Sequence, residues 1–240
     1  MKKPYFIIIV AVIGISAVFI SCYSLPHING NGVMVTSERD VSRFERIQIS
    51  GSATVNYHAS QEYRAVVTVD SNLEEYTRVY TEGDVLKIGT KNGKSYFFTN
   101  YTVDVYCPKL SAVSVSGSVR FNGIDKINTS KFTLGVSGSA KINGTYECNK
   151  FDADISGSSE IAVSGTAKEM SVTISGSVNF SGSEFQTNNA NVRVSGSGNI
   201  NIWVLDYLKA RISGSGRVTY RGNPKIDYTG SGSGRLISET

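Results

Sequence analysis

The sequence has few of the residues on which enzymes and metalloproteins usually depend. It contains two histidines, three cysteines and one tryptophan among 240 residues. Neither His27 nor His58 stands at metal-ligand spacing from a partner, and no Gly-x-Ser-x-Gly nucleophile elbow occurs. We therefore expect no metal site, no cofactor and no catalytic residue.

Proline and charge are also scarce. Four prolines, with no glycine at every third position, exclude collagen. Charged residues make up 18% of the chain, and Lys and Arg are scattered, so no nucleic-acid footprint is indicated. The chain holds 33 serines and 24 glycines, a composition typical of flexible linkers. The 40% of apolar residues can nevertheless bury a core, which argues against disorder of the whole chain.

One long apolar run occurs, at the N-terminus. Lys2 and Lys3 precede an apolar stretch from Phe6 to Ile20. This arrangement is typical of a secretory signal peptide, which we place at residues 1–21. An N-terminal anchor helix is the alternative, although the run is short for a membrane span.

The apolar run ends in Ser21-Cys22, which resembles the bacterial lipoprotein processing site. We expect the Cys22 thiol to be lipidated and to hold the mature chain on a membrane. Residues 22–37 carry Pro26 and two Asn-Gly pairs, which predicts a flexible tether. The expected location is the bacterial cell envelope, as an outer-membrane lipoprotein, with the membrane face left open.

A tripeptide repeat carries the fold prediction. Ser-Gly-Ser occurs nine times, and eight copies share one register, spaced 18–21 residues apart from Gly117 onward. The ninth copy, at 181–183, is out of register. This period suits one coil of a β-solenoid. The central glycines in register are Gly51, Gly117, Gly138, Gly157, Gly176, Gly196, Gly214 and Gly232.

Each repeat approaches its Ser-Gly-Ser through alternating residues. Phe132–Val136 and Phe151–Ile155 place apolar residues at their first, third and fifth positions. This period of two predicts half-buried strands whose inward side chains stack from coil to coil. A shorter strand and a turn signal, such as Asn143-Gly144, complete the repeat. We expect the glycines to be structural corner residues, because glycine tolerates positive φ and close backbone approach.

Residues 38–110 interrupt the period, because 66 residues separate Gly51 from Gly117. We predict a β-rich N-terminal portion there, comprising the first coil and a cap, followed by the repeat solenoid at 111–240. Whether 38–110 is a separate domain stays open. Residues 229–234 have little apolar content, which predicts a frayed last coil or an edge covered by another chain.

Cys107 and Cys148 could form a disulfide in an exported protein. The repeat register, however, places them about two coils apart, roughly 10 Å at strand spacing. That distance exceeds disulfide reach. We expect two unpaired, buried thiols.

With the lipoprotein signal, these repeats resemble a known family. Val/Ile-Ser-Gly-Ser recurs at 115–118, 136–139, 155–158, 174–177 and 194–197. The pattern is similar to the putative auto-transporter adhesin, head GIN domain family of secreted or lipid-anchored bacterial proteins, over about residues 38–235. The resemblance implies an all-β fold built as a right-handed parallel β-helix, and an adhesin role. It implies no catalytic residues.

Two clusters are candidate ligand contacts. Asp152 and Asp154 share one strand face about 7 Å apart, where they could hold a cation or serve polysaccharide chemistry. The alternative is two solvated carboxylates beside neighbouring lysines. Tyr96, Phe97 and Phe98 could stack on sugars or on a partner protein if exposed, and core packing is the alternative.

We therefore expect a non-enzymatic, lipid-anchored envelope protein of adhesin or scaffold type that binds through a polar solenoid wall. Its expected partners are the membrane, a glycan or an envelope or host protein, and a second copy contacted through the wall or the C-terminal edge. A carbohydrate-active β-helix enzyme (a polysaccharide lyase or hydrolase) and an envelope sensor or regulatory partner are the alternatives. A cleft lined by three or more charged side chains would favour the enzyme.

Overall fold

The computed structural model describes residues 27–239, which form an all-β fold. The expected signal peptide, Cys22 and the first residues of the expected tether lie outside this range. Within it, no helix has the length and hydropathy needed to cross a membrane. One short 3-10 turn, η1, spans Glu74–Tyr76.

The strands differ greatly in length, because several coils can run on as one continuous strand. In chain order they are β1 (His27–Asn29), β2 (Met34–Arg39), β3 (Arg46–Ala59), β4 (Arg64–Asp70), β5 (Thr77–Glu82), β6 (Val85–Thr90), β7 (Ser95–Phe97), β8 (Tyr101–Cys107), β9 (Ala112–Gly123), β10 (Ile127–Gly196), β11 (Asn199–Gly214), β12 (Arg217–Arg221), β13 (Lys225–Gly232) and β14 (Arg235–Ser238).

Twelve of the described strands belong to one large mixed sheet. Its main path runs β14-β12-β11-β10-β9-β3-β8-β4-β2, and the sheet does not close on itself within residues 27–239. Pairing is parallel from β3 to β14 and antiparallel among β2, β4 and β8 and between β5 and β6. β1 and β7 form a separate parallel pair.

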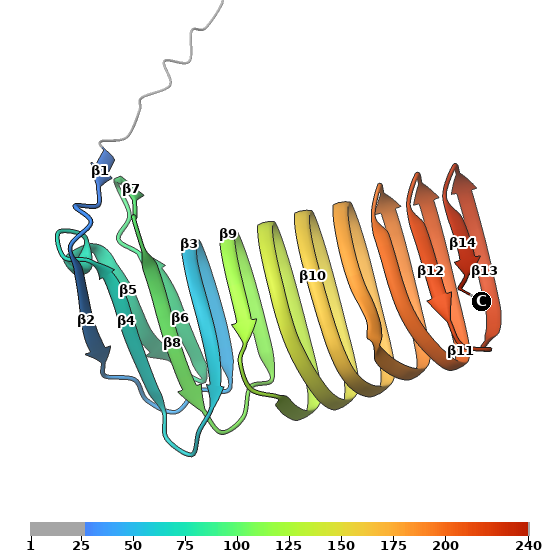
Figure 1. Ribbon diagram of the computed structural model, residues 1–240, viewed down its shortest axis with the longest axis horizontal. Helices are drawn as coiled ribbons and strands as arrows, with labels where there is room; N and C mark the ends of the chain where they lie inside the picture. Colours follow the sequence, from blue (N-terminus) through green and yellow to red (C-terminus); the bar gives the residue numbers. More distant parts are fainter. Residues whose placement is uncertain (1–26, 240) are drawn as a thin grey trace, which may run out of the picture.

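Figure 1 shows the repeat region as a row of stacked coils that ends at β13 and β14. The pairing register sets Gly51 opposite Gly117 and Gly117 opposite Gly138. At the other end of the row it sets Gly196 opposite Gly214, which in turn faces Gly232. One Ser-Gly-Ser repeat therefore corresponds to one coil, and its corner stacks on the corner of the next.

The apolar residues of each coil fill the interior of the row. Val136, Ile155, Ile174, Val194 and Ile212 are each at most 3% exposed. An aromatic cluster of Phe132, Tyr146, Phe151 and Phe185 fills the side opposite the corners. Burial of this apolar surface is the main stabilising contribution.

The corner glycines allow this stacking. All eight have positive φ, between +83° and +133°. A Cβ on Gly157 would lie 2.3 Å from the carbonyl oxygen of Gly138 in the preceding coil. Gly51 has the same positive φ, at +87°. A Cβ on Gly51 would have no atom within 4 Å, because no corner precedes it in the row. Inner corners thus need glycine for both conformation and space.

The N-terminal portion lies directly against the first coil. β6 pairs with β3 before its corner, and β8 pairs with β3 after it. Together they act as an additional layer in which residues 91–100 replace the Ser-Gly-Ser corner. β2, β4 and β5 then continue this layer with antiparallel strands. The inserted residues therefore close the first end of the row.

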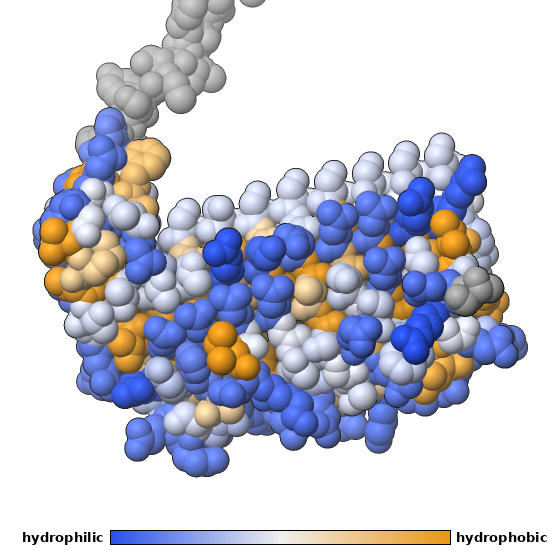
Figure 2. All heavy atoms as spheres, viewed as in Figure 1, coloured by the Kyte–Doolittle hydropathy of each residue, from blue (hydrophilic) through white to orange (hydrophobic). Residues whose placement is uncertain are grey.

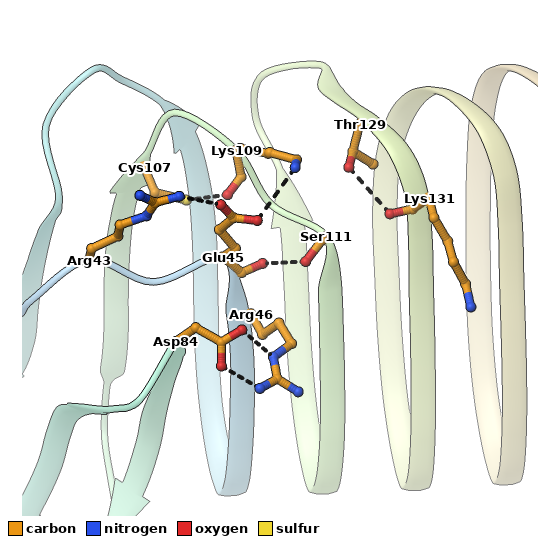
Figure 3. Close-up of polar contacts among 9 residues, drawn as sticks. All are labelled: Arg43, Glu45, Arg46, Asp84, Cys107, Lys109, Ser111, Thr129 and Lys131. Atoms are coloured by element: carbon orange, nitrogen blue, oxygen red, sulfur yellow. Dashed lines mark hydrogen bonds and ion pairs between the residues drawn. The ribbon is translucent and has the colours of Figure 1, made fainter.

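Polar contacts fix the N-terminal portion to the coils (Figure 3). The backbone N–H and the hydroxyl of Ser111 both donate to the Glu45 carbonyl, at 2.7 and 2.9 Å. The Arg43 guanidinium donates to the Glu45 carboxylate at 2.8 Å, which lowers the pKa of that carboxyl. Arg46 forms a two-pronged pair with Asp84. These contacts join the entry of β3 to β6 and β9.

The expected tether at residues 22–37 differs from the structure over residues 27–37. His27–Asn29 pair with β7, and Met34–Arg39 pair with β4. The physical reason is Asp70, whose side chain is fully buried. Its carboxylate accepts N–H bonds from Gly32 at 2.8 Å and Thr99 at 2.8 Å. This polar segment therefore has a fixed place in the fold.

The two described cysteines are unpaired. Cys107 is fully buried, and burial raises the pKa of its thiol to about 12. Cys148 is only half-buried, and partial desolvation raises the pKa of its thiol to about 11. Both thiols are therefore protonated near neutral pH.

Candidate functional site

A groove of about 690 Å³ crosses the first five coils beside their Ser-Gly-Ser corners. One end is lined by residues 98–101 of the N-terminal portion, and the remainder by residues that follow the corners. Figure 2 shows the N-terminal part rising above the row of coils, and the groove lies along the angle between them.

The groove repeats the same chemistry from coil to coil. The serine after each corner glycine contributes to its lining, and one polar residue two positions later stands beside it; Ser159 adds a second serine in the fourth coil. Parallel pairing spaces these side chains about 4.8 Å apart. The serines after the corner glycines are Ser52, Ser118, Ser139, Ser158 and Ser177, and the later residues are Thr54, Arg120, Lys141, Glu160 and Asn179. An extended ligand would meet a nearly periodic surface.

The charges of the groove leave one cation without a partner. Lys141 and Glu160 form an ion pair at 3.0 Å between neighbouring coils. Arg120 stands next to Lys141 in the pairing register. No carboxylate within residues 27–239 lies in ion-pair range of Arg120. The groove therefore has a net positive charge and a cation available to a ligand.

A ladder of amides orders the wall next to the groove. Asn56 donates to Asp104 at 2.9 Å and accepts from Asn122 at 2.9 Å. Asn122 in turn accepts from Asn143 at 3.4 Å. The ladder ties β8 to three successive coils, so the polar wall is held in place before any ligand arrives.

Of the three candidate aromatic residues, one lines the groove. Phe98 is half-buried at the groove end and stacks on Tyr101 at 4.9 Å between ring centroids. Tyr96 packs against Tyr76 outside the groove. Phe97 is 60% exposed and meets His27 edge to face. The segment is thus partly core and partly surface.

The two candidate carboxylates lie outside the groove. Asp152 is held by Lys131 at 3.1 Å and by Lys150 at 3.7 Å. Asp154 is exposed on the same strand. Within residues 27–239, no group of three His, Cys, Asp or Glu residues could hold a metal ion. The arrangement matches the alternative of two solvated carboxylates.

The groove is suited to binding more than to acid–base chemistry. Its one carboxylate, Glu160, is engaged by Lys141, whereas glycoside hydrolysis generally uses two carboxyl groups across the scissile bond. The other polar lining groups are hydroxyls, amides and cations, which donate and accept hydrogen bonds.

Sequence reasoning did not identify Arg120, Lys141 and Glu160. Each stands three positions after a corner glycine, on the short second strand. The alternation that sorts residues before the corner also holds after it, where it would have placed these side chains on the outer face. The alternation of residues after the corner is therefore a sequence signal for these three side chains.

Solved structures share this fold. A putative adhesin from Bacteroides fragilis NCTC 9343 has a TM-score of 0.78 and 18% identity, covering 88% of this chain and 97% of its own. A putative lipid binding protein from Parabacteroides distasonis ATCC 8503 has a TM-score of 0.73 and 25% identity, with 89% and 100% covered. A putative adhesin from the same strain has a TM-score of 0.71 and 26% identity, covering 89% of this chain and 100% of its own. No curated protein matches the chain.

A family match agrees with the repeats and with these structures. The sequence model described as putative auto-transporter adhesin, head GIN domain, matches residues 43–224. That range covers the first corner, most of the N-terminal portion and nearly all the coils. It is well over half of the 240 residues. The chain belongs to the putative auto-transporter adhesin, head GIN domain family.

Proposed function

We propose that this chain is a lipid-anchored cell-envelope protein of adhesin type that binds an extended acidic glycan along the groove. The observation that carries the proposal is the row of serine hydroxyls, one after each corner glycine of the groove, beside Arg120 and Lys141. The proposal includes a right-handed parallel β-helix as the finer description of the stacked coils.

The spacing of the groove favours a glycan. Neighbouring coils lie about 4.8 Å apart, close to the length of one sugar ring in an extended chain. Successive sugars would therefore meet successive serines in similar positions. Phe98 at the groove end offers an aromatic surface for the apolar face of a sugar ring.

The charge of the groove favours an acidic glycan over a neutral one. Arg120 is free of ion pairs within residues 27–239, and its planar guanidinium can bind a carboxylate or sulfate with two hydrogen bonds. Lys141 can contribute as well, although it already forms an ion pair with Glu160.

Membrane anchoring rests on Cys22. Five peptide steps separate Cys22 from His27, the first described residue, and they span at most about 18 Å. A lipid on Cys22 would therefore keep the folded part near the membrane. Cys22→Ala should release the protein from membranes in cell fractionation, and full retention of this variant would contradict the anchor.

A glycan array with the full chain, purified in detergent, tests the groove. Arg120→Ala and Lys141→Ala should each weaken binding to acidic glycans about tenfold, because each removes a charged hydrogen-bond donor. Arg217→Ala is the matched control, because Arg217 stands three positions after Gly214, outside the groove lining. Equal loss in all three variants, or no acidic glycan bound, would contradict the proposal. Release of glycan fragments would instead support the enzyme.

Lipid binding is a second candidate, favoured by a specific observation. A groove of about 390 Å³ crosses the last four coils and exposes mostly apolar surface, although most of its lining residues are polar. It is lined by residues 173–175, 193–195, 211–213 and 229–231. The Parabacteroides distasonis protein described as a putative lipid binding protein is 25% identical. A fluorescent fatty acid that binds the full chain, and is lost in Arg193→Glu but not in Arg120→Ala, would favour this candidate.

A further inference from the structure

The last coil presents two strand edges that pair on one side only. β13 pairs with β11, and β14 pairs with β12. Within residues 27–239, no strand lies against their outer edges. Such edges carry unpaired backbone N–H and C=O groups, which can pair with strands of another chain.

The interior of this coil is uncovered as well. Ile226 and Tyr228 face Leu208 and Ala210 of the preceding coil in the pairing register. Ile226 is 41% exposed and Tyr228 is 40% exposed, whereas both of their partners are fully buried. The exposure therefore arises because no strand within residues 27–239 packs against the outer side of this coil. The side chains that would pack against a further coil are already in place.

The opposite end of the row has its interior covered, although in the described part of the chain β2 and β5 each pair on one side only and Val33, Met34 and Tyr80 are exposed there. There η1 and the antiparallel strands close the interior, so that Leu73 is fully buried and Val79 is 7% exposed. Figure 1 shows β2 and β13 at opposite ends of the row. A head-to-tail contact would therefore set the open apolar end against a closed one.

The shape and charge of the open end fit a copy of itself. A single peptide strand could cover β13 or β14 but not both edges and the interior between them, whereas a coil covers all three. Residues 222–239 contain two cations and two anions, namely Lys225, Arg235, Asp227 and Glu239. The four side-chain charges sum to zero, so two identical ends can meet without net electrostatic repulsion.

We propose that the open C-terminal coil is a homophilic contact, on which the last coil of a second copy stacks about a two-fold axis. The two N-terminal ends of such a pair point away from each other. If the chain is anchored through its N-terminus, as the proposed function states, the contact joins molecules on opposed membranes.

Light scattering coupled to size-exclusion chromatography of the full chain in detergent tests the contact. The protein mass should rise from one chain to two with concentration. Ile226→Lys should raise the dissociation constant of the pair at least tenfold, because it puts a charge into the apolar contact. Ile124→Lys is the matched control, since Ile124 is also exposed, at 59%, but lies in the turn after β9. A wild-type chain that stays monomeric, or equal effects of the two variants, would overturn the proposal.

Lys225→Glu keeps the test independent of folding, because it changes an exposed side chain. It gives the open end a net negative charge, and the pair should weaken at low salt and recover at high salt. Full pairing at low salt would overturn the charge argument. Vesicles carrying the lipidated chain should cluster, and pairing without clustering would overturn the opposed arrangement. Glycan binding by Ile226→Lys should match the wild type, so failure of the groove proposal would leave the pairing result unaffected.

Discussion

The two ends of the coil row handle the same physical problem in different ways. At the N-terminal end, η1 and the antiparallel strands cover the interior, and Leu73 is fully buried. At the C-terminal end, Ile226 faces inward as its predecessors do and is 41% exposed. Each coil buries the coil before it, and within residues 27–239 nothing covers the last one.

The ends also differ in how carboxylates stabilise them. Asp70, at the closed end, is fully buried and accepts N–H bonds from Gly32, Thr99 and Asn100. Asp227, at the open end, pairs with Arg211 in solvent at 2.9 Å. The closed end is thus fixed by a buried hydrogen-bonded charge and the open end by a screened surface pair.

The largest effect is expected where an inner corner is compared with the first one. Gly157→Ala should destabilise the fold by about 4 kcal/mol, because the methyl group meets the Gly138 carbonyl and the residue keeps positive φ. Gly51→Ala should cost about 1 kcal/mol, because only the φ penalty applies. Urea unfolding of both variants measures the difference. Equal losses would show that corner stacking does not limit the fold.

Asp70→Asn should produce the next largest effect, a loss of about 2 kcal/mol, because the amide replaces a charged acceptor of buried N–H groups. The damage should be local, with faster hydrogen exchange at residues 30–33 and 98–100. An increase in hydrogen exchange spread evenly along the chain would contradict a local role for Asp70.

The same carboxyl predicts a pH dependence. Burial alone would raise the pKa of Asp70, but the N–H donors outweigh it and hold the pKa below the ordinary value. Its stabilisation is therefore complete above about pH 4 and is lost as the pH falls through the folded-state pKa. The closed end of the wild type should loosen in acid, and Asp70→Asn should lack this step. An identical acid response in both proteins would refute the assignment.

The smallest effect is expected at the open end. Arg211 lowers the pKa of Asp227 through hydrogen bonding, but both side chains are solvated. Asp227→Asn should leave the melting temperature unchanged within error, in contrast to Asp70→Asn. A loss as large as that of Asp70→Asn would remove the distinction between the two ends.

The repeat predicted the coils well because its signal is local. A corner glycine and alternating strand residues recur every 18–21 positions, and each coil obeys the same rule. The all-β class and the family followed from this pattern. The position of the corners in the pairing register follows from it too, since Gly117 pairs with Gly138.

The N-terminal portion was harder to predict because its structure depends on distant pairing. Nothing local in residues 64–107 indicates that β6 and β8 lie on either half of β3. The tether prediction is wrong over residues 27–37 for the same reason, since a buried Asp70 some 40 residues away fixes Gly32. The position of Phe98 at the end of the groove likewise depends on how this portion meets the coils.

Hydrogen exchange along the chain tests the contrast between a closed and an open end most directly. It should be measured on the Ile226→Lys variant, so that pairing between copies does not protect the last coil. The account predicts the slowest exchange in β9 to β11, intermediate rates in β2 and β4, and the fastest exchange in β13 and β14. Exchange in β2 and β4 that matches or exceeds that of β13 and β14 would contradict it.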